Sequence, residues 1–272
     1  MNLDQQIEAL NDRIRVLEAE NESLKTNELE LIEMNASKDK FLAIISHDLR
    51  NPINTVVGLS EMLEKNIEKN NFQSVAEYAK FIKQSTHRIK SLLLNLLEWS
   101  VSQSGKMQFK PSRNRLASII HEVLDLSEEM LKQKQLTVEV NCFENDDVII
   151  DRDMISSVVR NFLTNAIKFS YPEGKIKISC EGSGEHIVFL ISDNGMGMSP
   201  AILNSLFKIG ETIPTRGTEN ETGTGLGLLL CKEFIEKHQS EILVESEEGK
   251  GSTFKFHLPL SNKVNEFGSS FN

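Results

Sequence analysis

The chain has 272 residues, of which 26% are charged, and a formal net charge of −10. This length allows one large domain or two small ones, with enough apolar material for a core. The acidic balance argues against binding to nucleic acid or to an anionic membrane surface.

Localisation is suggested by two further features. No apolar run approaches the length of a membrane span, and the N-terminus lacks a signal-peptide pattern. Cys142, Cys180 and Cys231 have no metal-ligand spacing and stand in apolar or strand-like contexts, which favours buried free thiols. We expect a cytoplasmic protein, or the cytoplasmic part of a larger sensor.

Residues 1–37 carry a heptad seam that predicts a left-handed coiled coil. The seam comprises Leu3, Ile7, Leu10, Ile14, Leu17, Asn21, Leu24 and Leu31. A single asparagine at an a position, here Asn21, favours a parallel dimer in a fixed register. A lone amphipathic helix is the alternative, but no neighbouring segment would cover its apolar stripe.

The same heptad frame resumes at Leu42 and continues to Leu63, so one helix is predicted from about residue 2 to 69, with a bend at Pro52. In this frame His47 takes an f position, facing away from the seam, with Asn51 one turn later. An ordinary surface histidine is the simplest interpretation of His47 alone. A second helix with heptad spacing runs from Val75 to Leu96, and dimerisation would make a four-helix bundle.

The helical pattern breaks in a predicted hinge, residues 102–112, which contains Gly105 and Pro111. Beyond it, helices are predicted at 115–134 and 151–169, and strands at 136–142, 175–182, 186–194, 240–246 and 252–260. Helices against a mostly antiparallel sheet form a two-layer α/β sandwich. The polar tail, residues 261–272, is expected to be loose.

Three weak clusters in this second part suit a nucleotide. Asn161, Asn165 and Lys168 share one face of a predicted helix, where amides can ligate Mg²⁺ and an ammonium can meet phosphate. An ordinary polar helix face is the alternative for this cluster.

Asp193 ends an apolar strand, where its carboxylate can accept a hydrogen bond from an exocyclic amine such as that of adenine. Gly195 and Gly197 would let a ligand approach the backbone, although Asn-Gly is also strong turn chemistry.

The third cluster, Gly223, Gly225 and Gly227, leads into an apolar helix and suits an anion. The intervening residues, 206–221, suggest a mobile lid that contains Phe207.

The order of five motifs carries more weight than any one of them. "SHDLRNP", "NFLTNAIKFS", "DNGMG", "LFKIG" and "GTGLGL" closely resemble the H, N, first glycine, F and second glycine boxes of two-component sensor histidine kinases. The resemblance covers about residues 38–260. It implies a dimerisation and phosphotransfer hairpin at 38–104 and, at 105–260, the ATP-binding fold shared with gyrase and chaperone ATPases.

By this resemblance, His47 accepts phosphate from ATP and passes it to an aspartate of a response regulator receiver domain. Asp48 would orient the ring and act as a general base. Asn51 fills the last place of the family pattern H-[DE]-x-x-[NT], which implies phosphatase activity toward the regulator.

The resemblance also assigns the nucleotide contacts. Asn165 would ligate Mg²⁺, with Asn161 and Lys168 near the phosphates, and Asp193 would bind adenine. The remaining expected nucleotide-binding residues are Gly195, Gly197, Phe207, Gly223, Thr224, Gly225, Leu226 and Gly227.

Two other functions compete with the histidine kinase. One is a different ATPase of the same fold, which the His–Asp–Asn–Pro helix and the heptad seam argue against. The other is a non-catalytic dimeric scaffold, which the complete Asn165, Asp193 and glycine motifs argue against.

Overall fold

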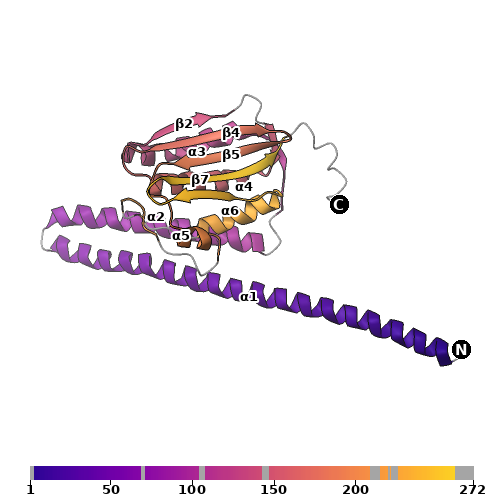
Figure 1. The fold of residues 1–272 in the computed structure, drawn as a ribbon. Helices are drawn as coiled ribbons and strands as arrows, with labels where there is room; N and C mark the ends of the chain where they lie inside the picture. The colour runs from indigo at the N-terminus through magenta and orange to yellow at the C-terminus, as the bar shows by residue number, and fades with distance from the viewer. Residues whose placement is uncertain are drawn as a thin grey trace. The chain divides into compact units, whose positions relative to one another are not determined.

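A computed structural model describes residues 3–68, 71–103, 108–142, 147–208, 215–219, 221 and 226–260 of the chain. The chain divides into two compact units, Met1–Asn51 and Pro52–Asn272. Figure 1 labels the helices and strands. Within the described residues, no helix is long and apolar enough to cross a bilayer.

Helix α1 spans Leu3–Glu68 and contains Pro52. A single helix was predicted over nearly these bounds, and the prediction is confirmed. In the first unit, the seam residues Ile14, Leu17, Leu24 and Leu31 are 46–66% exposed. These apolar side chains are therefore exposed to solvent in the single chain, as is expected of a coiled-coil seam that becomes buried when a second chain packs against it.

Helix α2 spans Phe72–Gln103 and confirms the second predicted helix. Just before it, Asn71 N donates a backbone hydrogen bond to Asn66 O of α1 at 2.9 Å. The Asn71 side chain also donates to Ser74 Oγ at 3.1 Å, in the first turn of α2. Asn71 thus links the last turn of α1 to the first turn of α2.

The predicted hinge falls partly on residues 104–107, which lie outside the described part of the chain. The residues after it are attached to the sheet domain. Lys110 N donates to Asp151 Oδ2 at 2.9 Å, and the Phe109 ring packs edge-on against His238 with centroids 4.9 Å apart. Residues 109 and 110 are thus held against the part of the chain that contains the sheet.

A five-stranded sheet with order β2-β4-β5-β7-β6 forms one layer of this domain. Strand β2 is parallel to β4, and all the other pairs are antiparallel. Helices α3 and α4 lie behind the sheet in Figure 1, so the predicted two-layer sandwich is confirmed. The predicted elements are α3 (Leu116–Gln133), β2 (Thr137–Asn141), α4 (Arg152–Phe169), β4 (Lys175–Ser183), β5 (His186–Asp193), α6 (Leu226–Lys237), β6 (Leu243–Glu247) and β7 (Gly251–Pro259).

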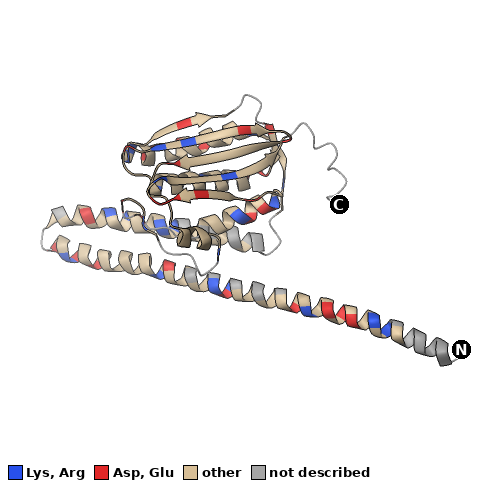
Figure 2. Cartoon of the chain, viewed as in Figure 1, with Lys and Arg blue, Asp and Glu red and all other residues tan. Residues whose placement is uncertain are grey.

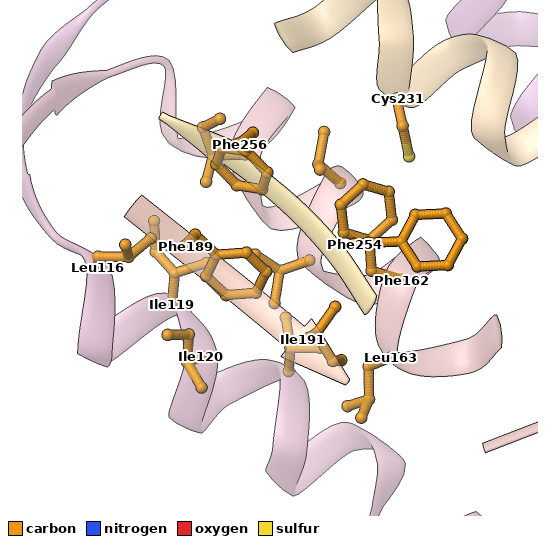
Figure 3. Packing of buried hydrophobic residues seen from close by; sticks show 14 of the residues in the cluster. Leu116, Ile119, Ile120, Phe162, Leu163, Phe189, Ile191, Cys231, Phe254 and Phe256 are labelled. Atoms are coloured by element: carbon orange, nitrogen blue, oxygen red, sulfur yellow. The ribbon is translucent and has the colours of Figure 1, made fainter. Parts of the chain in front are cut away.

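The core results from the period of two in the strands. Alternate residues of β5 (Ile187, Phe189 and Ile191) are buried, and β4 and β7 follow the same pattern. Phe189 stacks on Phe256 with ring centroids 4.9 Å apart, and Phe162 of α4 meets the sheet beside them (Figure 3). Cys180 and Cys231 are buried, while Cys142 is half-buried.

The strands carry charged residues of both signs (Figure 2), which alternate with the buried residues of the core. Lys175 of β4 pairs with Glu139 of β2 at 2.5 Å, and Lys255 of β7 pairs with Glu245 of β6. Such exposed cross-strand pairs contribute little stability each, about 0.2–1 kcal/mol. The face that carries these pairs is solvated, whereas the predicted nucleotide-binding residues of α4 belong to the helical layer.

Three short elements were not predicted from the sequence. Strands β1 (Ser112–Arg115) and β3 (Asp147–Ile150) form a separate antiparallel pair, and α5 spans Pro200–Ser205. β1 has no apolar alternation, so only its pairing with β3 makes it a strand. α5 is a single capped segment whose N-cap is the Ser199 side chain.

Candidate nucleotide and phosphoacceptor sites

Helix α4 presents the three polar side chains of the first predicted cluster. Its N-cap is Asp151, whose side chain accepts a hydrogen bond from Met154 N at 3.2 Å. Asn161 and Asn165 are half-buried and Lys168 is buried, so this face is covered by other parts of the domain. An ordinary solvated helix face would be exposed, so its burial favours a site.

The side chains of this face differ in their bonding. Asn161 Nδ2 donates to Ser157 O, one turn earlier, at 2.9 Å. Lys168 Nζ donates to Thr215 O at 3.2 Å. Within the described residues, the side-chain amide of Asn165 has no hydrogen-bond partner, so its oxygen is available to a ligand.

The surroundings of Lys168 lower its pKa to about 8. Burial, which disfavours the charged ammonium, is the largest cause; Glu221 opposes it, while Arg88 and Lys134 add to it. A bound anion would reverse part of this effect by supplying the missing negative charge. Lys168 is therefore suited to a phosphate group.

Asp193 ends β5, as predicted, and its surroundings raise its pKa to about 6. Burial is the main cause, and backbone hydrogen bonds from Gly195 and Ser252 partly oppose it. The bond from Gly195 N to Asp193 Oδ1 is 2.9 Å long. Among the residues that the structure describes, Asp193 has no cationic partner, and a half-buried carboxylate of this kind is typical of a functional site rather than of a stabilising ion pair.

Gly195 and Gly197 are required first by the protein's own backbone. A Cβ atom on Gly195 would lie 2.1 Å from Phe169 O, and one on Gly197 would lie 2.0 Å from Glu247 O. Met196 N also donates to Phe169 O at 3.0 Å. Gly195 lets the loop after β5 close against the end of α4, which brings Asp193 to the helix that carries Lys168, while Gly197 lets the same loop approach the end of β6.

Gly227 in the first turn of α6 lies against Asn161. A Cβ atom there would be 2.3 Å from Asn161 Oδ1. The structure therefore brings Gly227, the described glycine of the third predicted cluster, to Asn161 of the first. Gly223, Thr224 and Gly225 lie outside the described residues, as does the side chain of Leu226.

The predicted lid is described only at its two ends. Phe207 is half-buried and packs against the hydrophobic core. Residues 215–219 and 221, which we call the lid arm, lie along the end of α4, where Thr218 N donates to Lys168 O at 3.1 Å. Residues 209–214 and 220 lie outside the described part of the chain.

His47 and Asp48 belong to the first unit. His47 Nδ1 lies 3.1 Å from Asp48 Oδ1, and 75% of the His47 side chain is exposed. The predicted f position, facing away from the seam, agrees with this exposure. Asn51, one turn later on α1, is exposed as well.

The residues fit a magnesium ion carried by a nucleotide better than a protein-only metal site. Within the described residues, no group of three or more His, Cys, Asp or Glu side chains is placed to hold a metal. Mg²⁺ in nucleotide enzymes commonly takes one or two protein ligands, with phosphate oxygens and water completing the shell. The free amide oxygen of Asn165 matches that requirement.

Sequence reasoning missed Lys134, Thr218 and Glu221. The Lys134 side chain is 4% exposed and pairs with Glu221 at 2.5 Å. Lys134 follows the exposed Lys132 in a run of polar residues, so no local pattern marks it as buried. It is buried between the end of α4 and the lid arm, both far from it in sequence.

Two family models match the chain in succession. Residues 37–105 match the His Kinase A (phospho-acceptor) domain, and residues 150–262 match the histidine kinase-, DNA gyrase B-, and HSP90-like ATPase. The first match contains His47, Asp48 and Asn51. The second contains the three nucleotide clusters described above.

Curated relatives are similar over most of this chain. The circadian input-output histidine kinase CikA of Synechococcus elongatus is 32% identical over 83% of the chain, and the phytochrome-like protein Cph1 of Synechocystis is 30% identical over 84%. The chain spans about 30% of the length of each of these relatives. They are therefore larger proteins that share this part.

Solved structures share the fold. The Acinetobacter baumannii histidine kinase AdeS has a TM-score of 0.62 at 24% identity, covering 79% of this chain and 98% of that one. Histidine kinase ThkA in complex with response regulator protein TrrA has a TM-score of 0.64 at 23% identity, covering 81% of this chain and 61% of that one. At these identities the likeness concerns the arrangement of elements.

Proposed function

Since the chain belongs to the sensor histidine kinase family, as its catalytic core, we propose that it phosphorylates His47 with ATP and then transfers the phosphoryl group to a response regulator. The acceptor would be an aspartate of the regulator's receiver domain. One observation carries the proposal. The half-buried Asp193 carboxylate is held against the end of the helix that carries Asn165 and Lys168, in a chain that also bears an exposed His–Asp pair.

Asp193 would select the adenine base. Its carboxylate is a hydrogen-bond acceptor only, so it suits the exocyclic amine of adenine and disfavours a base that presents a carbonyl there. A hydrogen bond to a buried charged group contributes roughly 1.5–3 kcal/mol. The raised pKa indicates that this carboxylate is poorly solvated when no ligand is bound.

The α4 face and the glycine-rich start of α6 would bind the phosphates. Lys168 supplies a positive charge, and Asn161 and Asn165 supply amides. Gly223, Thr224, Gly225, Leu226 and Gly227 would offer backbone N–H groups at a helix N-terminus. Asn165 would ligate Mg²⁺, which neutralises charge on the β- and γ-phosphates when bound with the nucleotide.

The phosphoryl transfer would use the outward nitrogen of His47. With Nδ1 occupied by Asp48, the tautomer that donates from Nδ1 leaves a lone pair on Nε2. Nε2 attacks the γ-phosphorus, a nitrogen–phosphorus bond forms, and the bond from the γ-phosphorus to the bridging oxygen of ADP breaks. Asp48 stabilises the positive charge that develops on the ring and accepts the Nδ1 proton.

Regulator dephosphorylation is the second proposed activity. It would regenerate the unmodified aspartate by attack of a water molecule on its phosphoryl group. Asn51 is exposed one turn after His47 on α1, and a carboxamide there would orient that water. The same surface of the helix would then serve both directions of signalling.

Dimerisation is the proposed assembly. The phospho-acceptor domain family that matches residues 37–105 implies a dimer, and the heptad seam of residues 1–37 would join two chains as a parallel coiled coil. The exposed seam side chains of the single chain support this assembly. Each chain would contribute two helices to a four-helix bundle.

Incubation of the purified chain with γ-labelled ATP and Mg²⁺ tests the function. We expect acid-labile, base-stable label on the wild-type chain and none on His47→Gln. His121→Gln is a matched control, because His121 is an exposed histidine on another helix, α3. Acid-stable label would indicate a serine or threonine kinase. ATP hydrolysis without label would indicate a different ATPase, and no binding at all would favour the scaffold.

A further inference from the structure

Lys134 carries a buried ammonium that the proposed mechanism does not use. It is the C-cap residue of α3, and its side chain is 4% exposed. A buried ammonium is costly unless hydrogen bonds and a negative charge compensate it. The groups that contact this ammonium therefore indicate the role of its charge.

One set of partners is the C-terminal end of α4. Lys134 Nζ donates to Ile167 O and Lys168 O, both at 3.0 Å, and to Ser170 O at 3.4 Å. The last carbonyls of a helix have no partner within the helix, and their negative partial charge favours a cation. Lys134 thus fixes the end of the helix that carries the proposed phosphate contacts.

The other set of partners is the lid arm. Lys134 Nζ donates to Thr218 Oγ1 at 2.8 Å and pairs with Glu221 Oε1 at 2.5 Å. Thr218 Oγ1 in turn donates to Ser170 O at 2.6 Å. Burial raises the pKa of Glu221, but the hydrogen bonds from Lys134 and from backbone N–H groups outweigh it, so the net pKa of Glu221 is lowered and its carboxylate stays ionised.

The lid arm lies directly against Lys168. A Cβ atom on Gly217 would lie 2.6 Å from Lys168 Cγ, and the Lys168 ammonium itself donates to Thr215 O. The position of the Lys168 ammonium therefore depends on where the lid arm is held. Lys134 is the cation that holds it there.

We propose that Lys134 is a positioning residue of the nucleotide site, which fastens the lid arm to the end of α4 and so places Lys168 for the phosphates. This inference rests on the proposed nucleotide-binding function and adds a residue to it. The loop after Asp193, the proposed adenine contact, is joined to the end of α4 by a different bond. Met196 N donates to Phe169 O at 3.0 Å, and Lys134 takes no part in this contact. Loss of Lys134 should consequently weaken phosphate binding selectively.

The test compares two ligands on the full chain. The dissociation constants of a non-hydrolysable ATP analogue with Mg²⁺ and of adenosine are measured for the wild type and for Lys134→Met. We expect the dissociation constant of the triphosphate analogue to rise roughly tenfold in the variant. The dissociation constant of adenosine should rise by less than about twofold. Lys132→Met is the matched control, because Lys132 is 72% exposed and pairs with Glu128 of its own helix, so both constants should stay unchanged.

Glu221→Gln and Thr218→Val provide the second test if Lys134→Met does not fold. Both change the lid arm, and the Glu221 side chain is 33% exposed, so the fold should tolerate its replacement. Each substitution should weaken binding of the triphosphate analogue and leave binding of adenosine nearly unchanged. Equal losses of affinity for both ligands, or an unchanged affinity for the triphosphate analogue, would overturn the role of Lys134. A wild-type chain that binds neither ligand would instead overturn the proposed function and this inference with it.

Discussion

The Nδ1 atom of His47 lies 3.1 Å from Oδ1 of Asp48, the next residue of the same helix, while 75% of the His47 side chain is exposed. Neighbouring helical residues normally point in different directions, so this contact requires the two side chains to turn toward each other. The arrangement orients the ring without burying it. A nucleophile that has to meet a nucleotide and then a partner protein benefits from both properties.

Replacing Asp48 by Asn should slow autophosphorylation by roughly 100-fold, because the amide can neither accept the Nδ1 proton nor stabilise the developing charge on the ring. Nucleotide affinity should stay unchanged, since Asp48 belongs to the other unit. The rate is measured by single-turnover labelling at saturating ATP. Asp39→Asn, at an exposed position of the same helix, is the control and should behave as the wild type.

Replacing Asn51 by Ala should abolish dephosphorylation of the regulator and leave autophosphorylation within about twofold of the wild type, because water orientation matters only in the hydrolytic reaction. The two activities are followed with a labelled chain and with a separately phosphorylated receiver domain. Asn54→Ala, three residues further along α1 and also exposed, should affect neither. Loss of both activities in Asn51→Ala would remove its assigned role.

Asp193→Asn should have opposite effects on binding and on stability. At about pH 7.5 the carboxylate is ionised, although its surroundings raise its pKa to about 6. A raised carboxyl pKa contributes stability below the pKa of the unfolded chain, and this contribution is lost as the pH rises through about 6. The ligand-free variant should therefore be more stable than the wild type at that pH by about 1–3 kcal/mol, yet bind adenosine at least roughly tenfold more weakly.

The pH dependence distinguishes this explanation from a general repacking effect. The stability advantage of Asp193→Asn should shrink as the pH falls from about 7 to about 4, as measured by urea unfolding. Wild-type affinity for adenosine should fall over the same range, since the protonated carboxyl is a poorer acceptor. Asp153→Asn, at an exposed position in the first turn of α4, should lack both effects. An advantage that is independent of pH would contradict the assignment.

Two glycine substitutions should separate function from folding. A Cβ on Gly227 would meet the end of the Asn161 side chain, which can turn away, so Gly227→Ala should fold but bind the Mg²⁺ nucleotide roughly tenfold more weakly. A Cβ on Gly195 would meet the backbone carbonyl of Phe169 at 2.1 Å, so Gly195→Ala should destabilise the domain by about 2–4 kcal/mol.

Gly182→Ala is the control for both changes. It lies in β4, and a Cβ there would meet no atom within 4 Å, so its effect on the free energy of unfolding should be small. Thermal melts with and without nucleotide measure both quantities. If Gly227→Ala bound nucleotide as the wild type does, Gly227 and Asn161 would not share the site.

Local pattern alone predicted a large part of the molecule. The heptad frame predicted α1 and the outward direction of His47, because a regular helix fixes the direction of every side chain relative to its seam. The shared face of Asn161, Asn165 and Lys168 follows from the same periodicity. Alternation likewise predicted the strands that build the core, and Asp193 was correctly expected at the end of one of them.

Tertiary structure decided the properties that depend on residues far apart in the chain. The pKa of Asp193 is raised by burial in the folded domain, and Gly195 is required by a carbonyl of α4. β1 is a strand only because it pairs with β3. Lys134 shows the difference most clearly, because a lysine in a polar run is expected in solvent. Its burial requires carbonyls of α4 and the lid arm, which meet only when the domain is folded.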